Sequence, residues 1–275
     1  MPLDAPFPEL DELLTAIGEA GRRVSDIEAS EGSAGNISVY IGWPVDGRRR
    51  FPLGERMELP EPAPELAGGS LLVSGSGRRL REILRDPAAN LAFVQVEPGG
   101  RTAQVYTSPR RLFARPTSEF NSHLAVHRDQ VALTGTNFHA LIHAQPPHLT
   151  YLSHIPRYQD ELYLNRHILR WQPESIVQLP EGVGYVPFAV PGSQALMQAT
   201  VAALRTHRVV LWGKHGAMAR SDASVKRACD RVEYAETAAR YEYMNLQNGE
   251  AGEGLSAAEI RAICAAFGVE QGMFL

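Results

Sequence analysis

The stretch FHALIH, residues 138–143, is an apolar run of strand length that ends in a histidine. A second stretch, VVLWGKHG at residues 209–216, has the same plan and carries His215 near its end. Short apolar runs of this kind predict buried strands, and each would present an imidazole at a strand end. Neutral imidazole is the commonest metal ligand in proteins, so His143 and His215 are candidate ligands, although a structural role would also fit each of them.

An acidic residue lies upstream of both histidines, in a segment with the composition of a helix start. The segment is PTSE, residues 116–119, in which Thr and Ser are capping residues and Glu119 falls in the first helical turn. The helix dipole alone would favour a glutamate there. Together with the two histidines, however, this carboxylate suggests a metal site with a general base.

Composition places the chain among ordinary globular proteins. Of its 275 residues, 21% are charged and 44% hydrophobic, and the net charge of −4 argues against a nucleic-acid partner. No apolar stretch approaches the about 20 residues of a membrane helix and no signal pattern opens the chain, so we expect a cytoplasmic protein without membrane contact.

Cys229 and Cys264 lack metal-site spacing and are expected to be reduced packing residues. Because Lys214 and Lys226 are the only lysines, Schiff-base chemistry has almost no candidate.

Strand and helix patterns alternate along the whole chain, without a linker or an internal repeat. Strands are expected at residues 35–41, 71–73, 91–96, 102–106, 138–143, 175–179, 183–186 and 209–216. Helices are expected at residues 8–26, near 80–84, at 118–128, after 147, and at 193–206, 221–246 and 256–267. Residues 42–69 would form an irregular excursion with room for a short hairpin. The pattern predicts one α/β/α layered domain over residues 1–275, with a mostly antiparallel or mixed central sheet.

Three small polar turns lie next to these elements. They are SAGN at residues 33–36, SGSG at 74–77 and TS at 117–118. Backbone N–H groups and hydroxyls in such turns can cradle a phosphate, although each turn alone is ordinary turn chemistry. Their number, together with the two histidines, favours an anion site.

Further segments complete an ordered set of motifs. The set comprises GNxS after the first helix, VSGSG, PTSE and LWxxHG, with RDPAANL (85–91), PEGVG (180–184), VPG (190–192) and FGV (267–269). Each motif alone is weak, but their order resembles class II, adducin-type sugar-phosphate aldolases nearly from end to end. The chain looks most similar to the branch that acts on ketose 1-phosphates such as rhamnulose 1-phosphate.

This resemblance implies a reaction, a cofactor and an assembly. The reaction is the reversible cleavage of a ketose 1-phosphate into dihydroxyacetone phosphate and an aldehyde, through an enediolate that a divalent metal stabilises. Zn²⁺ is the first expectation for that metal, with Mn²⁺ or another divalent ion as the alternative. Relatives are cyclic tetramers, so a homotetramer with active sites shared between subunits is expected here.

The resemblance also implies roles for individual residues. Glu119 matches the catalytic acid/base, and Glu174 matches an acid that reaches the active site of a neighbouring subunit. His143 and His215 match metal ligands. The residues that match the substrate phosphate site are Gly35, Asn36, Ser76, Gly77, Thr117 and Ser118.

Two positions depart from the family pattern. Gln145 takes the place of the second histidine of a His-x-His ligand pair, and Ser33 takes the place of an asparagine in the phosphate turn. Strand alternation would put Gln145 on the same face as His143, where its amide oxygen could bind the metal. Alternatively, Gln145 could weaken metal binding or shift the preference of the site towards Mn²⁺ or Mg²⁺. It could also mark a chain that has lost catalysis. A further option is that another histidine replaces the missing ligand, such as His139 or His148.

Other histidines and other functions remain as alternatives. His123 and His127, one helical turn apart, are expected at the surface or in a subunit contact. His139 shares a strand face with His143 and is a reserve ligand. The same fold also serves pentulose-phosphate epimerases and decarboxylases, and non-catalytic adducin-like modules that bind or oligomerise.

Overall fold

The computed structural model describes residues 2–274, and at its centre lies one sheet of nine strands. In spatial order the strands are β2, β5, β4, β3, β1, β6, β9, β8 and β7. Their bounds are β1 Asn36–Ile41, β2 Leu53–Glu58, β3 Ser70–Ser74, β4 Leu91–Val96, β5 Thr102–Thr107, β6 Phe138–Ala144, β7 Val183–Val186, β8 Val209–Trp212 and β9 Gly216–Ser221. Neighbouring strands are antiparallel except β7 and β8, which are parallel. The predicted mostly antiparallel, mixed sheet is confirmed.

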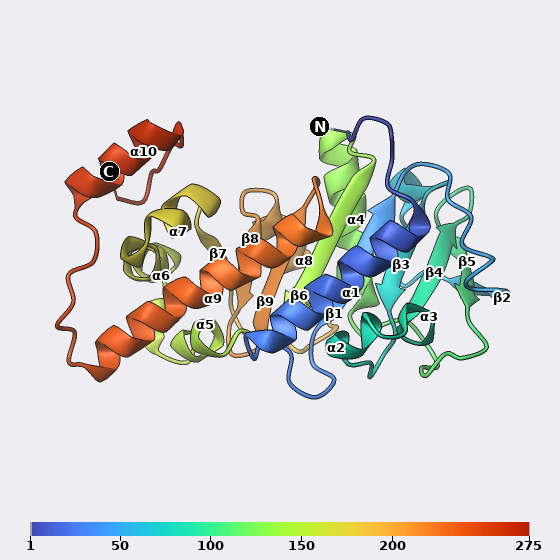
Figure 1. Cartoon of the computed structure of the whole chain (residues 1–275), viewed down its shortest axis with the longest axis horizontal. Coiled ribbons are helices and arrows are strands. Elements are labelled where there is room, and N and C mark those ends of the chain that lie inside the picture. The colour runs from blue at the N-terminus through green and yellow to red at the C-terminus, as the bar shows by residue number, and fades with distance from the viewer. Residues whose placement is uncertain (1, 275) are drawn as a thin grey trace.

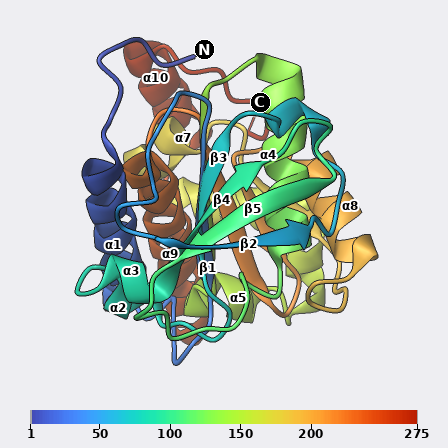
Figure 2. The ribbon, with the colours of Figure 1, turned by 90° about the vertical axis from the view of Figure 1, so that its right-hand side faces the viewer.

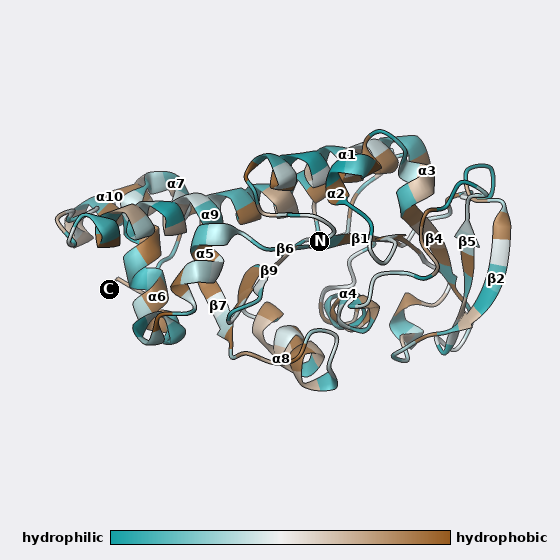
Figure 3. Cartoon of the chain, turned by 90° about the horizontal axis from the view of Figure 1, so that it is seen from below, coloured by the Kyte–Doolittle hydropathy of each residue, from teal (hydrophilic) through white to brown (hydrophobic). Residues whose placement is uncertain are grey.

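Helices cover both faces of this sheet, as Figures 1 and 3 show. The longer helices are α1 Leu10–Asp26, α4 Phe120–Thr134, α6 Glu161–Ile168, α8 Gln194–Leu204, α9 Val225–Gln247 and α10 Ala257–Phe267. The shorter ones are α2 Leu80–Ile83, α3 Pro87–Asn90, α5 Pro147–Leu152 and α7 Pro173–Gln178. Helices α1 and α9 lie side by side on one face, and α4 and α8 pack together on the other, so the predicted α/β/α layering is confirmed. Within residues 2–274, no helix has the length and apolarity needed to span a membrane.

Alternation along the central strands separates an apolar face from a polar one. Ile37 of β1 and Ile142 of β6 belong to the large core that also contains the apolar residues of α1 and α9. Because successive side chains of a strand point to opposite faces, Ser38, His139 and His143 face the layer that contains α4. All three are buried. The sheet therefore delivers polar groups into the interior on the α4 side.

Several segments differ from their predicted form, and helices α3 and α6, for example, lie where no element is expected. The strand expected at residues 175–179 is wrong, because residues 175–178 belong to α7, a helix that starts at Pro173. Its β-branched Ile176 and Val177 favour a strand locally. Packing of α7 against α9 and α10 buries Ser175 and Ile176 and makes the helix the stable form. Conversely, residues 217–220, for which no element is expected, lie in β9 because β6 and β8 pair with it on both sides.

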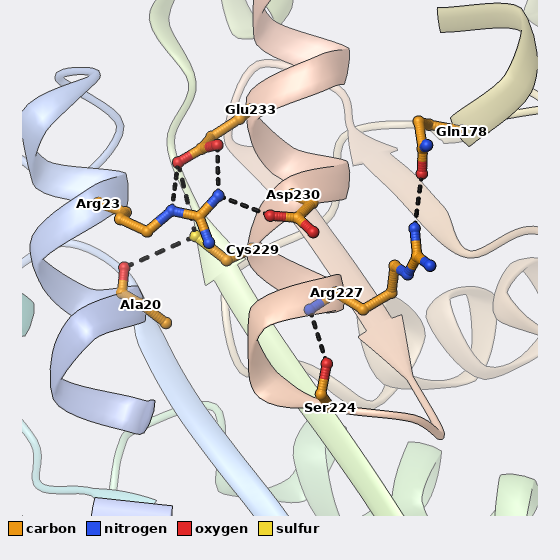
Figure 4. Close-up of polar contacts among 8 residues, drawn as sticks. All are labelled: Ala20, Arg23, Gln178, Ser224, Arg227, Cys229, Asp230 and Glu233. Carbon is orange, nitrogen blue, oxygen red and sulfur yellow. Dashed lines mark hydrogen bonds and ion pairs between the residues drawn. The ribbon is translucent and has the colours of Figure 1, made fainter. Parts of the chain in front are cut away.

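An arginine joins the two helices that lie side by side on one face (Figure 4). Arg23 of α1 places Nη2 at 2.6 Å from both Asp230 Oδ1 and Glu233 Oε2 of α9. Its Nε donates to the other oxygen of Glu233 at 2.9 Å. Beside this ion pair, Cys229 is a free, buried thiol near the Ala20 carbonyl, as expected of a packing residue, and the other cysteine is also free.

The sheet ends at strand β2, which forms an exposed edge. Strand β2 comes from the irregular residues 42–69 and pairs with β5 rather than forming a hairpin of its own (Figure 2). Apart from half-buried Met57, its side chains are exposed, and they include Glu55, Arg56 and Glu58. This edge is therefore charged.

Candidate active site

The antiparallel pairing brings the ends of several strands together at one edge of the sheet. Asn36, the first residue of β1, lies opposite His143, near the end of β6. Gly216, which opens β9, lies at the same edge because the end of β6 pairs with the start of β9. Neighbouring antiparallel strands run in opposite directions, so a strand start and a strand end meet there. His215 immediately precedes β9 and is brought to the same place.

Glu119 completes a cluster with the two predicted histidines. It lies just before α4 and is buried, with 4% of its surface exposed. Its Oε2 lies 3.6 Å from His143 Nε2, and its Oε1 lies 3.6 Å from His215 Nε2. One ligand atom from each of the three residues lies within 4.8 Å of the others. Residues far apart in the sequence therefore offer one carboxylate and two imidazoles to a common point.

Neighbouring groups fix the orientation of the histidine rings. His143 Nδ1 lies 3.0 Å from the carbonyl oxygen of Ala217, to which it can only donate a hydrogen, so Nε2 is the ring nitrogen that faces Glu119. The His143 ring also packs against Trp212, with ring centroids 4.5 Å apart, and against His215 at 4.9 Å. His215 Nδ1 is buried and has no hydrogen-bond partner among residues 2–274.

The charges in this cluster suit a cation. Burial raises the pKa of Glu119, but His143 and the hydrogen bond from Asn36 outweigh burial, so the pKa is lowered and the carboxylate is ionised. Burial and the neighbouring His143 lower the pKa of His215, which favours its neutral form. An ionised carboxylate beside two imidazoles is a donor set that divalent transition metals bind. The residues present therefore fit such an ion.

Gln145 lies beside the cluster, directly after β6. Its backbone N–H donates to the carbonyl of Ala29 at 2.7 Å. A Cβ placed on Gly216 would lie 3.1 Å from Gln145 Cγ and 3.0 Å from His143 Cε1, so the three residues are immediate neighbours. Metal binding by the Gln145 amide stays a prediction.

The two histidines considered as replacements for the missing ligand lie in other contacts. His148 Nδ1 is 2.5 Å from Glu236 Oε1, and His139 Nδ1 is 2.8 Å from His127 Nδ1. Among residues 2–274, the cluster of candidate ligands of the His, Cys, Asp and Glu types holds neither of them.

The turns predicted to hold phosphate surround the cluster. The 74–77 turn and the 115–118 turn lie side by side, because Thr117 N–H donates to the Ser74 carbonyl and Ser76 N–H donates to the Arg115 carbonyl, each at 2.9 Å. Gly35 has φ of +82°, and a Cβ there would lie 2.8 Å from the His143 carbonyl oxygen, so a larger residue would not fit. The Asn36 side chain is buried and donates to Glu119 Oε2 at 2.8 Å.

A surface pocket of about 440 Å³ borders the second of these turns. Thr117, Ser118 and Arg115 line part of it, whereas Glu119, His143 and His215 do not. Arg115 is exposed and was not singled out from the sequence, where its position one residue before the PTSE motif was the only available signal.

Glu174 is not brought to this cluster within one chain. It lies in the first turn of α7 and borders a different pocket together with Arg23, Asp230 and Glu233. Its predicted role in the active site of a neighbouring subunit stays a prediction.

The expectation that His123 and His127 lie at the surface or in a subunit contact is wrong. Both are fully buried, because α4 is packed between the sheet and α8 and its polar side chains face the interior. They contact Ser38 of β1, the serine of the GNxS motif, to which the sequence assigned no role of its own.

The chain belongs to the class II aldolase and adducin family, whose N-terminal domain profile matches residues 15–243. The predicted family resemblance is therefore confirmed.

Individual relatives are class II sugar-phosphate aldolases. The rhamnulose-1-phosphate aldolase of Yersinia pestis (strain Pestoides F) is 29% identical over 242 residues, with 87% of each chain covered. The solved structure of a sugar-phosphate aldolase from Thermotoga maritima has a TM-score of 0.75 and 28% identity, covering 87% of this chain and 97% of that one. The L-fuculose-1-phosphate aldolase of Thermus thermophilus shares the fold, with a TM-score of 0.55 and 20% identity over 88% of this chain and 98% of that one. The expectation of a class II aldolase-type enzyme, an aldehyde-lyase, agrees with these relatives.

Proposed function

We propose that this chain is a metal-dependent aldolase that reversibly cleaves a ketose 1-phosphate of the rhamnulose 1-phosphate type into dihydroxyacetone phosphate and an aldehyde. The observation that carries the proposal is the buried Glu119 carboxylate, with one oxygen 3.6 Å from Nε2 of His143 and the other 3.6 Å from Nε2 of His215. The rhamnulose-1-phosphate aldolase relatives support the substrate class.

The metal would be held by His143 and His215, with Gln145 as the third protein ligand. Zn²⁺ is the first candidate, and Mn²⁺ is the alternative because an amide oxygen is a harder ligand than imidazole. A divalent ion at this point would polarise the ketose carbonyl and stabilise negative charge that develops on the substrate oxygens. Both lysines of the chain are exposed, so amine catalysis has no buried candidate.

The substrate phosphate would bind where the polar turns meet. The backbone N–H groups of Gly35, Gly77 and Ser118 and the hydroxyls of Ser76, Thr117 and Ser118 would donate to its oxygens. Asn36 would belong to the same phosphate site, while its side chain donates a hydrogen bond to Glu119. The phosphate would thus fix the distance of the reacting carbon from the carboxylate.

Glu119 would move the proton on the reacting carbon. In the condensation direction its carboxylate takes a proton from the hydroxymethyl carbon of dihydroxyacetone phosphate. The electron pair left on that carbon forms the new bond to the aldehyde carbon, and the aldehyde oxygen takes up a proton. We assign this second proton transfer to the partner subunit's Glu174. In cleavage the same steps run in reverse, and Glu119 returns the proton to carbon.

A panel of ketose 1-phosphates, with product detection, tests this function. Purified protein loaded with Zn²⁺ or Mn²⁺ should release dihydroxyacetone phosphate, and chelation should abolish the release. Glu119→Gln should lose turnover while retaining binding of a phosphate ligand, because the amide cannot accept the proton. Exposed Glu19→Gln, in α1, is the control and should keep full activity. Retained turnover in Glu119→Gln would refute the role of Glu119, and epimerised or decarboxylated products would refute the reaction.

Gln145 favours a second candidate, a non-catalytic adducin-like module that binds or oligomerises. A metal analysis distinguishes the two. About one divalent ion per chain after metal addition supports the aldolase, whereas none supports the binding module.

A further inference from the structure

A continuous set of polar side chains leads from Glu119 into the interior. Between the sheet and α4, the side chains of Ser38, His123, His127 and His139 are all fully buried. Ser38 Oγ lies 2.6 Å from His123 Nδ1 and 2.6 Å from His127 Nε2. His127 Nδ1 lies 2.8 Å from His139 Nδ1.

At its other end this set reaches the catalytic carboxylate through an amide. His123 Nε2 forms a short hydrogen bond with Asn36 Oδ1, and Asn36 Nδ2 donates to Glu119 Oε2 at 2.8 Å. We call Asn36, Ser38, His123, His127 and His139 the buried histidine chain. Its five members come from two strands and one helix.

The three histidines of the buried histidine chain are neutral. Burial lowers the pKa of His123 and of His139 to about 3, and it lowers the pKa of His127 well below the ordinary value. Charged groups around His139 include Arg220 and Arg231, which also lower its pKa, and Asp222, which raises it; the lowering prevails. A neutral imidazole has one N–H and one lone pair, so each ring donates once and accepts once.

Neutral rings allow only one direction for the hydrogens. The carboxylate of Glu119 can only accept, so Asn36 turns its NH₂ to Glu119 and its oxygen must accept from His123 Nε2–H. His123 Nδ1 then accepts from the Ser38 hydroxyl, and Ser38 in turn accepts from His127 Nε2–H.

The same constraint continues to the far end of the chain. His127 Nδ1 must accept from His139 Nδ1–H, which leaves the lone pair of His139 Nε2 as the terminus. That nitrogen is buried and has no hydrogen-bond partner among residues 2–274. This agrees with a series of hydrogen bonds that ends at His139.

We propose that the buried histidine chain is a one-directional series of hydrogen bonds that holds Asn36, and through it the Glu119 carboxylate, in a single orientation. Its members are positioning residues: they act on the reaction only through Glu119. The inference rests on the role of Glu119 in the proposed function, but the direction of the hydrogens can be tested independently of turnover.

Neutron diffraction from deuterium-exchanged crystals of the whole protein tests that direction. Deuterium is expected on His123 Nε2, His127 Nε2 and His139 Nδ1, with the other nitrogen of each ring bare. A deuterium on the opposite nitrogen of any of these rings, or on both nitrogens, would overturn the proposal. This result would stand even if the protein cleaved no ketose 1-phosphate.

Removing the central hydroxyl tests whether the chain positions Glu119. In Ser38→Ala, a crystal structure should show the Glu119 carboxylate in more than one orientation. Its kcat should fall roughly 10- to 100-fold with KM little changed, the size of effect seen when groups that orient active-site residues are lost. Ser122→Ala is the matched control, because Ser122 is also fully buried, lies in α4, and its hydroxyl has no partner among the described residues.

Equal losses in the two serine variants, or an unmoved Glu119 in Ser38→Ala, would show a packing role only and overturn the positioning claim. A second pair of variants guards against a general folding defect. His123→Gln keeps a donor for Asn36 and an acceptor for Ser38, so it should retain more kcat than His123→Phe. The opposite order would contradict the proposal.

Discussion

At Gln145 the chain has an amide where the family resemblance predicts an imidazole, and this residue lies immediately beside His143 and Gly216. Because zinc prefers imidazole to a neutral amide oxygen, Gln145→His should raise zinc affinity by roughly tenfold or more, about 1.4 kcal/mol. Competition with a chromogenic chelator measures the change. The control is Gln247→His, at an exposed position of α9. Weaker zinc binding in Gln145→His would show that the site is shaped for the amide.

The sequence indicated Glu119, His143 and His215 because each stands at the start or end of a clear periodic segment. His123 and His127 were misplaced for a physical reason: whether a polar side chain of a helix is exposed depends on what packs on that helix. Here α8 covers α4 and the sheet supplies Ser38 and His139 as partners. The signal was a serine inside the otherwise apolar run of β1, which could not be paired with a helix before the layers were known.

At the scale of elements, long segments with a clear period were predicted well, and short ones were decided by their neighbours. Helices α1 and α9 and the paired strands β4 and β5 lie near their expected positions. Helix α7 resembles a strand locally, and β9, with the sequence GAMARS, shows little alternation of apolar and polar residues. Their forms follow from packing on α9 and from pairing with β6, which local patterns do not report.

The α1–α9 pair gives a stability prediction. Replacing Arg23 by Met leaves Asp230 and Glu233 close together without their shared cation, so the free energy of unfolding should fall by about 1–2 kcal/mol. Urea denaturation at neutral pH measures the loss, and high salt should reduce it. Arg22→Met, one residue earlier and exposed, is the matched control and should be close to neutral. An equal loss in both variants would assign the effect to α1 itself.

For the whole molecule, the buried histidines predict sensitivity to mild acid. Burial lowers the pKa of His123 and of His139 to about 3, whereas unfolded histidine titrates near about 6.5. Between these values the unfolded chain binds more protons, so the free energy of unfolding falls as pH is lowered, by about 1.4 kcal/mol per pH unit for each such histidine. Glu119, whose pKa is also lowered, adds a loss in the same direction below its ordinary pKa.

Urea denaturation between about pH 7 and pH 5 measures this slope. His139→Phe should reduce the mean slope over this range by about 1 kcal/mol per pH unit, because one protonation on unfolding is lost and the unfolded histidine is only partly protonated near pH 7. His154→Phe, at an exposed position, should leave the slope unchanged. A slope that does not respond to His139→Phe would mean that this ring is protonated in the folded protein.

Mixing two inactive variants tests whether active sites are shared between subunits. If active sites are shared between subunits of a tetramer, Glu119→Gln and Glu174→Gln should each lose most turnover as pure proteins. Mixed and reassembled together, they should regain part of it, because some sites would then combine an intact Glu119 with an intact Glu174 from the next subunit. Sedimentation should give four chains per particle. Absence of recovery in a mixture shown to contain hybrid tetramers would place both residues outside a shared site.

The outermost strand of the sheet has a consequence for how copies can meet. Among the described residues, one side of strand β2 has no neighbouring strand. Its side chains include Glu55, Arg56 and Glu58, with Arg56 Nε 3.0 Å from Glu97 Oε2. A second copy docking edge to edge would have to strip water from these charges. This edge of the sheet is thereby guarded against open-ended stacking into fibres, and a closed ring of copies would have to be built through other surfaces of the molecule.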